Sequence, residues 1–117
     1  MILMVVAMLS MTMTSYAENE NAENINNVEN YDMSVNMRKL AVALDMTFEQ
    51  METVGDIHRT FCAEMMIAAH ASKDERDELV DKAIVKDLRY MRFVLDHAQY
   101  RKYVLLLNTT LHNRGLK

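Results

Sequence analysis

The sequence predicts an all-α protein, and three observations support this prediction. The chain of 117 residues contains no proline and only two glycines, so it offers few of the breaks that short strands need. Apolar residues recur at spacings of three and four after residue 34, which is the period of an amphipathic helix. Helix-capping sequences precede these stretches. We therefore expect a long helical hairpin with a short N-terminal helix and a bent C-terminal helix.

One short phrase occurs twice and predicts two helix starts. It combines an apolar residue, a capping residue and a glutamine three positions after the cap. The two copies are Met46, Thr47, Gln50 and Leu95, Asp96, Gln99. Each is a capping box, in which the Thr or Asp side chain accepts from the N–H of the third helical residue and the Gln reaches back to the N–H of the cap. We interpret both glutamines as structural.

These signals predict four helices, and a third capping box is expected where Ser72 precedes Glu75. The first helix begins at residue 32 or 34 and continues to 44, and the second runs from the cap at Thr47 to about His70. The third covers 73–95, and the fourth follows Asp96 and ends at Gly115. The short link near residue 72 makes the second and third helices an antiparallel hairpin.

The first 17 residues of the chain predict that the protein is exported. Residues 1–17 are apolar and end in small residues, which is typical of a secretory signal peptide. A membrane anchor or a buried helix is the alternative, but about 13 apolar residues are too few to cross a bilayer, which requires about 20. Residues 18–31 read as a disordered, acidic leader rich in Asn and Glu. Residues 32–117 then form a single helical domain, and no membrane span is expected in the mature chain.

The charge pattern argues against nucleic-acid binding. The formal net charge is −4, and residues 18–32 hold five acids and no base, which leaves 12 acids and 13 bases in residues 33–117. A nearly neutral domain lacks the basic surface that duplex binding needs, and export would separate it from nucleic acid.

His58 and Cys62 form the candidate metal site. They are four residues apart on one face of the second helix, where they could bind zinc or copper. Two ligands are fewer than the three or four of a zinc site, so a place at the boundary of the core is the alternative. Cys62 has no second cysteine in the chain, and it is either buried or paired between two chains.

Basic and aromatic residues alternate between positions 82 and 102, which indicates a surface for an unfolded or acidic partner. A solvated face of two core helices is the alternative. Ile67, Leu105 and Leu106 fall outside the apolar stripes of their helices, as residues of an exposed binding surface would. The candidate partner surface comprises Ile67, Lys86, Arg89, Tyr90, Phe93, Arg101 and Leu105.

The repeated phrase resembles the Leu-Thr-x-x-Gln repeat of the Spy/CpxP family of periplasmic proteins. Met46 replaces Leu in the first copy, and Asp96 replaces Thr in the second. The stretch from Gln99 to Gly115 is also similar to small uncharacterised exported proteins of the Bacteroides group. The Spy/CpxP resemblance implies a bent helical hairpin, a dimer that forms a cradle, and ATP-independent holding of unfolded clients or binding to an envelope stress sensor. Some relatives bind zinc.

The expected function is that of an exported binding protein, in the periplasm or secreted, which is chaperone-like or related to envelope stress. We expect a homodimer with unfolded or envelope proteins as partners, no cofactor and no enzymatic activity, because no phosphate loop or catalytic triad is present. Two alternatives stay open. One is metal binding or metal sensing through His58 and Cys62, and the other is a structural or interaction protein without client or metal.

Overall fold

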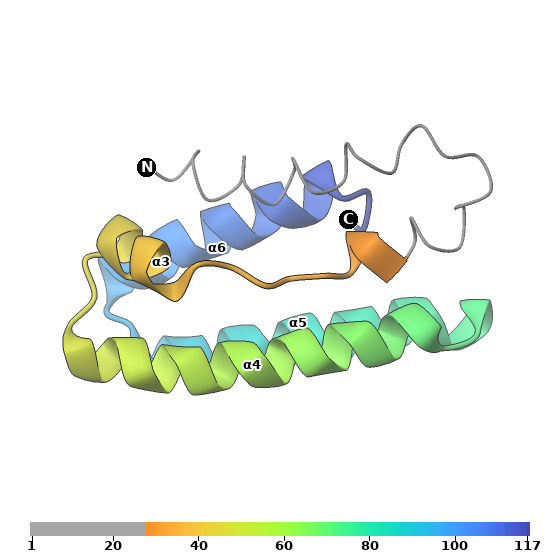
Figure 1. Ribbon diagram of the computed structural model, residues 1–117, viewed down its shortest axis with the longest axis horizontal. Helices are drawn as coiled ribbons and strands as arrows, with labels where there is room; N and C mark the ends of the chain where they lie inside the picture. Colours follow the sequence, from red (N-terminus) through yellow and green to blue (C-terminus); the bar gives the residue numbers. More distant parts are fainter. Residues whose placement is uncertain (1–27) are drawn as a thin grey trace.

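The computed structural model describes residues 28–117, and this part of the chain confirms the all-α prediction (Figure 1). Its main elements are α3 (Met37–Leu44), α4 (Phe48–His70), α5 (Lys73–Val94) and α6 (His97–Asn113), and it contains no strand. None of these helices is long and apolar enough to cross a membrane. The predicted signal peptide, residues 1–17, lies outside the described residues, as do residues 18–27 of the predicted leader.

Helices α4 and α5 form the predicted antiparallel hairpin, joined by a link of only two residues. Thr47 caps α4 in a complete capping box, since its side chain accepts from the N–H of Gln50 (3.1 Å) and Gln50 accepts from the N–H of Thr47 (2.9 Å). The predicted capping box at Ser72 is wrong. Ser72 occupies the cap position of α5, but its side chain makes no capping hydrogen bond. The N–H of Glu75, which a capping box would use, donates instead to the backbone carbonyl of Ser72 (3.1 Å).

Helix α3 begins later than predicted, at Met37, because Asn36 is its cap and accepts from the N–H of Lys39 (3.1 Å). Asp32 does not start this helix but forms a turn, in which its carboxylate accepts hydrogen bonds from the N–H (3.0 Å) and the hydroxyl (2.6 Å) of Ser34. Helix α3 ends at Leu44, and the next residue, Asp45, adopts the left-handed conformation with φ of 57°.

Two residues, Leu95 and Asp96, separate α5 from α6, which turns back across the hairpin as the expected bend requires. Asp96 and Gln99 form its capping box, with both bonds present. Its C-terminal end is a Schellman motif, in which Leu116 N–H donates to Leu111 C=O (2.9 Å) and Gly115, with φ of 74°, supplies the left-handed residue. The predicted stop at Gly115 is confirmed.

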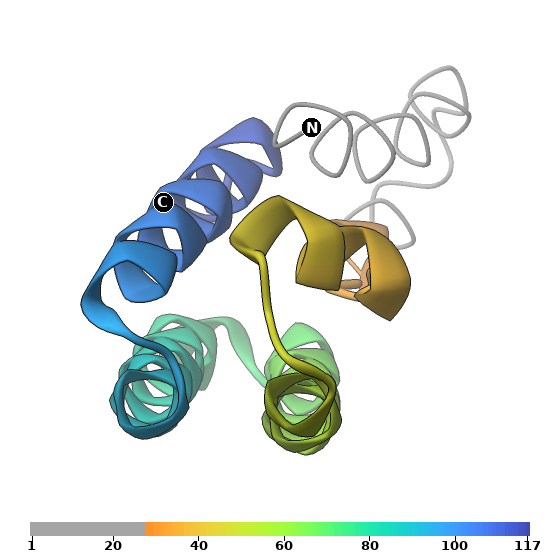
Figure 2. The same ribbon diagram turned by 90° about the vertical axis from the view of Figure 1, so that its left-hand side faces the viewer.

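The core lies between two layers. Figure 2 shows α4 and α5 side by side, with α3 and α6 together on one face of this pair. The opposite face of the hairpin carries no described helix. The core side chains are apolar residues from all four helices and from the segment before α3. The main ones are Tyr31, Met33, Leu40, Leu44, Val54, Phe61, Met65, Val80, Met91, Tyr103, Leu107 and Leu111.

Residues 28–31 belong to the folded domain, which corrects the predicted extent of the leader. Residues 28–30 are helical, and Tyr31 is only 7% exposed. The guanidinium of Arg114, at the end of α6, holds this segment by donating to the carbonyls of Glu29 (3.1 Å) and Asp32 (2.8 Å). The Asn and Glu content of the segment predicted disorder, but its backbone carbonyls accept hydrogen bonds from the buried guanidinium of Arg114.

Candidate functional site

The two copies of the repeated phrase meet in space. The side-chain amides of Gln50 and Gln99 form a reciprocal pair, in which each Nε2 donates to the other Oε1, at 2.8 and 3.0 Å. Each Nε2 also donates to a carbonyl of the opposite junction, from Gln50 to Val94 (3.0 Å) and from Gln99 to Asp45 (2.9 Å). Each Oε1 also accepts from the N–H of its own cap residue.

This pair, which we call the glutamine joint, satisfies all the hydrogen-bonding groups of both amides. Its pattern is nearly two-fold, because Val94 and Asp45 each lie two positions before a cap residue. The joint ties the start of α4 to the start of α6, across the end of the hairpin. Because no hydrogen-bonding group of either amide is left unused, the joint has a structural role, which is the interpretation made from the sequence.

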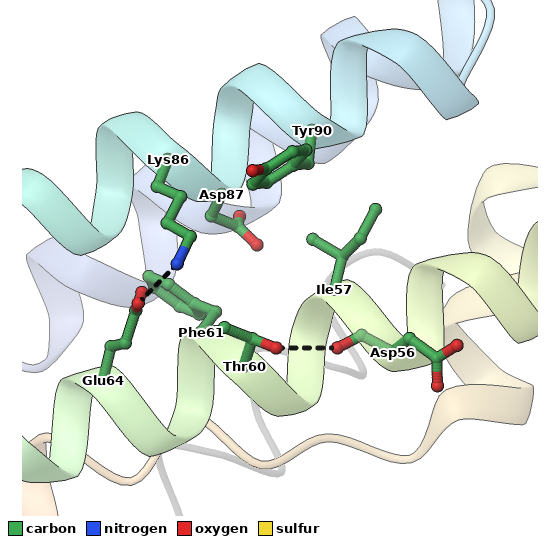
Figure 3. Close-up of a pocket in the computed structure, with 8 residues that line it drawn as sticks. All are labelled: Asp56, Ile57, Thr60, Phe61, Glu64, Lys86, Asp87 and Tyr90. Atoms are coloured by element: carbon green, nitrogen blue, oxygen red, sulfur yellow. Dashed lines mark hydrogen bonds and ion pairs between the residues drawn. The ribbon is translucent and has the colours of Figure 1, made fainter.

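A groove runs along the hairpin between α4 and α5, and Figure 3 shows its lining side chains in front of the remaining ribbon. One hollow near the middle of this groove has a volume of about 330 Å³. A neighbouring hollow continues past Ile67 and shares Glu64 and Lys86 with the first. The residues that line the first hollow are Asp56, Ile57, Thr60, Phe61, Glu64, Lys86, Asp87 and Tyr90. Glu64 and Lys86 form an ion pair of 2.9 Å across the groove.

The predicted partner surface divides between two places. Ile67, Lys86 and Tyr90 line the groove, and Arg89 lines the adjoining surface with Tyr90. Ile67 is 62% exposed, which is unusual for a large apolar side chain.

Three other residues of that predicted surface line none of the described hollows. Phe93 is 81% exposed on α5, near the end of the hairpin that carries the glutamine joint. Arg101 and Leu105 are exposed on α6, in the other layer. Leu106 is buried, contrary to the expectation, because it lies on the core side of α6 one turn from Tyr103.

A buried carboxylate lies beneath the groove. Asp87 is 2% exposed, and its Oδ2 accepts a hydrogen bond from the hydroxyl of Tyr103 on α6. No donor among the described residues reaches its Oδ1. Burial raises the pKa of Asp87 to about 7, while the hydrogen bond from Tyr103 opposes this rise and the charge of Glu64 adds to it. The group therefore titrates near neutral pH.

Sequence reasoning missed Asp87, although a signal was present. Residue 87 lies four positions after Ala83 and four before Met91, both of which are buried on the same face of α5. An acid at a core position of an amphipathic stripe requires an explanation.

His58 and Cys62 lie on the side of α4 that faces the segment before α3. His58 Nε2 donates to the carbonyl of Met33 (2.8 Å), and its buried Nδ1 has no partner among the described residues. Burial lowers the pKa of His58, so its ring stays neutral. Burial also raises the pKa of the half-buried Cys62 to about 11, and the charges of Asp32 and Asp87 add to this rise. The thiol therefore stays protonated at neutral pH.

Residues 28–117 contain no cluster of three or more His, Cys, Asp or Glu side chains that could hold a metal ion. A metal at His58 and Cys62 would therefore need further ligands from a second molecule or from solvent.

No protein-family model matches this chain, and no curated protein or solved structure does so either.

Proposed function

We propose that the chain is an exported binding protein that holds apolar segments of unfolded or envelope proteins, without ATP, in the groove of the α4–α5 hairpin. One observation carries this proposal. The groove exposes large apolar side chains, Ile67 and Tyr90, on a face of the hairpin that no described helix covers. Two packed helices with an open apolar groove can accept an extended or helical segment.

The electrostatics of α5 support the same proposal. Lys82, Lys86 and Arg89 lie along the groove and its adjoining surface. On the adjoining surface, these bases attract acidic residues of a client and speed the encounter, whereas the hollow itself is lined by the carboxylates of Asp56, Glu64 and Asp87. The resemblance of the repeated phrase to the Spy/CpxP repeat supports a chaperone-like role, as does the predicted signal peptide.

Suppression of aggregation by the full chain tests the proposal. A chemically denatured client is diluted into buffer, and light scattering is followed at equimolar chain. We expect the wild type to suppress scattering and a variant with Ile67→Ser and Tyr90→Ser to lose most of this effect, because its groove is no longer apolar.

Leu105→Ser is the matched control for this assay. Leu105 is 55% exposed but lies on α6, away from the groove. We expect this variant to suppress scattering as the wild type does. An inactive wild type, or an equal loss in the control, would contradict the proposal.

Metal binding at His58 and Cys62 is a second candidate, because the buried Nδ1 of His58 has no partner among the described residues. Calorimetric titration with zinc and with copper tests it. The expected result is binding that is lost in the His58→Gln, Cys62→Ser variant and kept in His70→Gln, whose ring is exposed. Binding that survives the double substitution would place the metal elsewhere.

A structural or interaction protein is the third candidate, and the molecular mass in solution addresses it. A dimer that persists in reductant, with no client or metal binding, would favour it. A dimer that dissociates in reductant would identify a link through Cys62.

A further inference from the structure

The hollow above Asp87 combines an apolar wall with one buried acid. Phe61 and Ile57 of α4 and Tyr90 of α5 form the wall, and Figure 3 shows the Asp87 carboxylate directed from α5 toward α4 among them. The volume of about 330 Å³ lies within the range of small-molecule sites. Asp87 offers one oxygen, Oδ1, that accepts no hydrogen bond from the described residues. A buried carboxylate oxygen without a donor is unfavourable, and a ligand that supplies one would gain affinity.

The charges around the hollow favour a cation as that donor. Three carboxylates line it. Asp56 pairs with Arg59, and Glu64 pairs with Lys86 at 2.9 Å. Asp87 has only the neutral hydroxyl of Tyr103. One negative charge of the hollow therefore lacks a basic partner among the residues that contact it. The rings of Phe61 and Tyr90 are also suitable neighbours for a cation, because an aromatic face attracts positive charge.

We propose that this hollow binds an organic cation, an ammonium or guanidinium group on an apolar stem, whose charged end donates to Asp87 Oδ1 while the stem packs against Ile57, Phe61 and Tyr90. Two sources can supply this group. One is a free amine, and the other is a lysine or arginine side chain of a segment held in the groove. Only the second source rests on the proposed function.

Phenethylamine is the probe, and 2-phenylethanol is its neutral counterpart. Each is titrated into the full chain at pH 8, where Asp87 is largely ionised and a primary amine is still protonated. Amide chemical shifts are followed by NMR. We expect the amine to move the resonances of Thr60, Phe61, Asp87 and Tyr90 and to bind at least about tenfold more tightly than the alcohol. Equal affinities, or shifts elsewhere in the chain, would overturn the proposal.

Asp87→Asn keeps the shape of the side chain and removes its charge. We expect it to weaken phenethylamine binding at least about tenfold and to leave 2-phenylethanol binding unchanged. Asp81→Asn is the matched control, because Asp81 is an exposed acid on the same helix. An unchanged affinity in Asp87→Asn would overturn the proposal. The comparison of amine with alcohol uses the wild type alone, so it stays decisive if the variant does not fold.

Competition with peptides identifies the source of the cation. The probe is an apolar peptide with one central lysine, and its counterpart carries acetyllysine at that position. Displacement of phenethylamine by the lysine peptide alone assigns the cation to a protein side chain. Displacement by neither assigns it to a free amine. Equal displacement by both would overturn the requirement for a cation.

The two proposals fail separately. Suppression of aggregation without amine binding removes the cation site and leaves the client groove. Amine binding without suppression leaves the cation site as that of a small molecule.

Discussion

Two polar clusters lie inside the helical domain, and they differ in how completely their hydrogen-bonding groups are used. In the glutamine joint, both amides use every donor and acceptor, and all the partners belong to the chain itself. In the second cluster, Asp87 has one partner, Tyr103, and keeps one buried oxygen without a donor among the described residues. A fully satisfied polar cluster specifies structure, whereas a partly satisfied one costs stability unless something else completes it.

The positions of the clusters agree with this contrast. The joint lies where chain direction changes twice, before α4 and before α6. Asp87 lies beneath an open groove. The first cluster therefore has nothing to offer a ligand, while the second has both an unused acceptor and a route to it.

Removal of Gln99 should have the largest effect on stability. Gln99→Met keeps the length of the side chain but strands the amide of Gln50, the carbonyl of Asp45 and the N–H of Asp96. We expect the free energy of unfolding to fall by about 3 kcal/mol, measured by urea denaturation. A loss below about 1 kcal/mol would contradict the view that the glutamine joint stabilises the fold through its complete set of hydrogen bonds.

The double variant Gln50→Met, Gln99→Met sharpens the first test. The two amides bond to each other, so the loss in the double variant should be smaller than the sum of the two single losses. Additive losses would show that the reciprocal pair contributes nothing of its own.

In contrast to Gln99→Met, Asp87→Asn should increase the stability of the folded chain at alkaline pH. The pKa of Asp87 is about 7 in the folded chain and near 3.8 when it is unfolded, so the folded state holds its proton more tightly. This group therefore makes stability fall as pH rises from 4 through 7, by up to about 1.4 kcal/mol per pH unit. We expect Asp87→Asn to be roughly 2 kcal/mol more stable than the wild type at pH 8 and similar to it at pH 4.

The difference in unfolding free energy between the wild type and Asp87→Asn isolates the contribution of Asp87. The groups around Asp87 are Glu64 and Cys62 of α4, Lys86 and Tyr90 of α5, and Tyr103 of α6. All of them are present in both chains, so their own titrations cancel to first order in the difference of unfolding free energies. A difference that does not change between pH 4 and pH 8 would contradict the raised pKa.

Tyr103→Phe tests the one bond that Asp87 has. The hydroxyl donates to Oδ2 and lowers the pKa of the acid, so its loss should move the pKa of Asp87 further upward. We expect a loss of about 1 kcal/mol in stability. NMR titration of the Asp87 carboxyl carbon measures the pKa, and a value unchanged from the wild type would show that the bond does not stabilise the carboxylate.

The smallest effects concern the caps. Thr47→Ala should cost about 1 kcal/mol, because its side chain accepts from the N–H of Gln50. Ser72→Ala should stay within about 0.5 kcal/mol, since Ser72 makes no capping bond. Thermal denaturation of both variants provides the comparison, and equal losses would mean that Ser72 caps α5 in solution.

The sequence was sufficient for features that depend on neighbours along the chain. Thr47 and Gln50 are three residues apart, so their bonds follow from spacing alone, as do those of Asp96 and Gln99. The same reasoning failed at Ser72, because the spacing allows a side-chain cap but does not require one, and the N–H of Glu75 donates to the Ser72 carbonyl instead. The helices α4, α5 and α6 were likewise predictable, because their apolar residues recur at spacings of three and four.

Contacts between distant segments were not predictable in this way. The amides of Gln50 and Gln99 meet only because α6 turns back over the hairpin, and no local pattern fixes that angle. The Asp87 and Tyr103 pair depends on the same docking. The stripe containing Asp87 could have indicated a buried acid, but its partner and the hollow above it needed the packed structure.

The long sequence separation within the glutamine joint has a kinetic consequence. Its cross-junction bonds join residues 44 to 54 positions apart, so they form only after α4, α5 and α6 have come together. Interactions made late in folding are absent from the transition state, and their loss speeds unfolding more than it slows refolding. We therefore expect the joint to set the lifetime of the folded chain, so that in stopped-flow experiments Gln99→Met would unfold much faster than the wild type and refold at nearly the same rate.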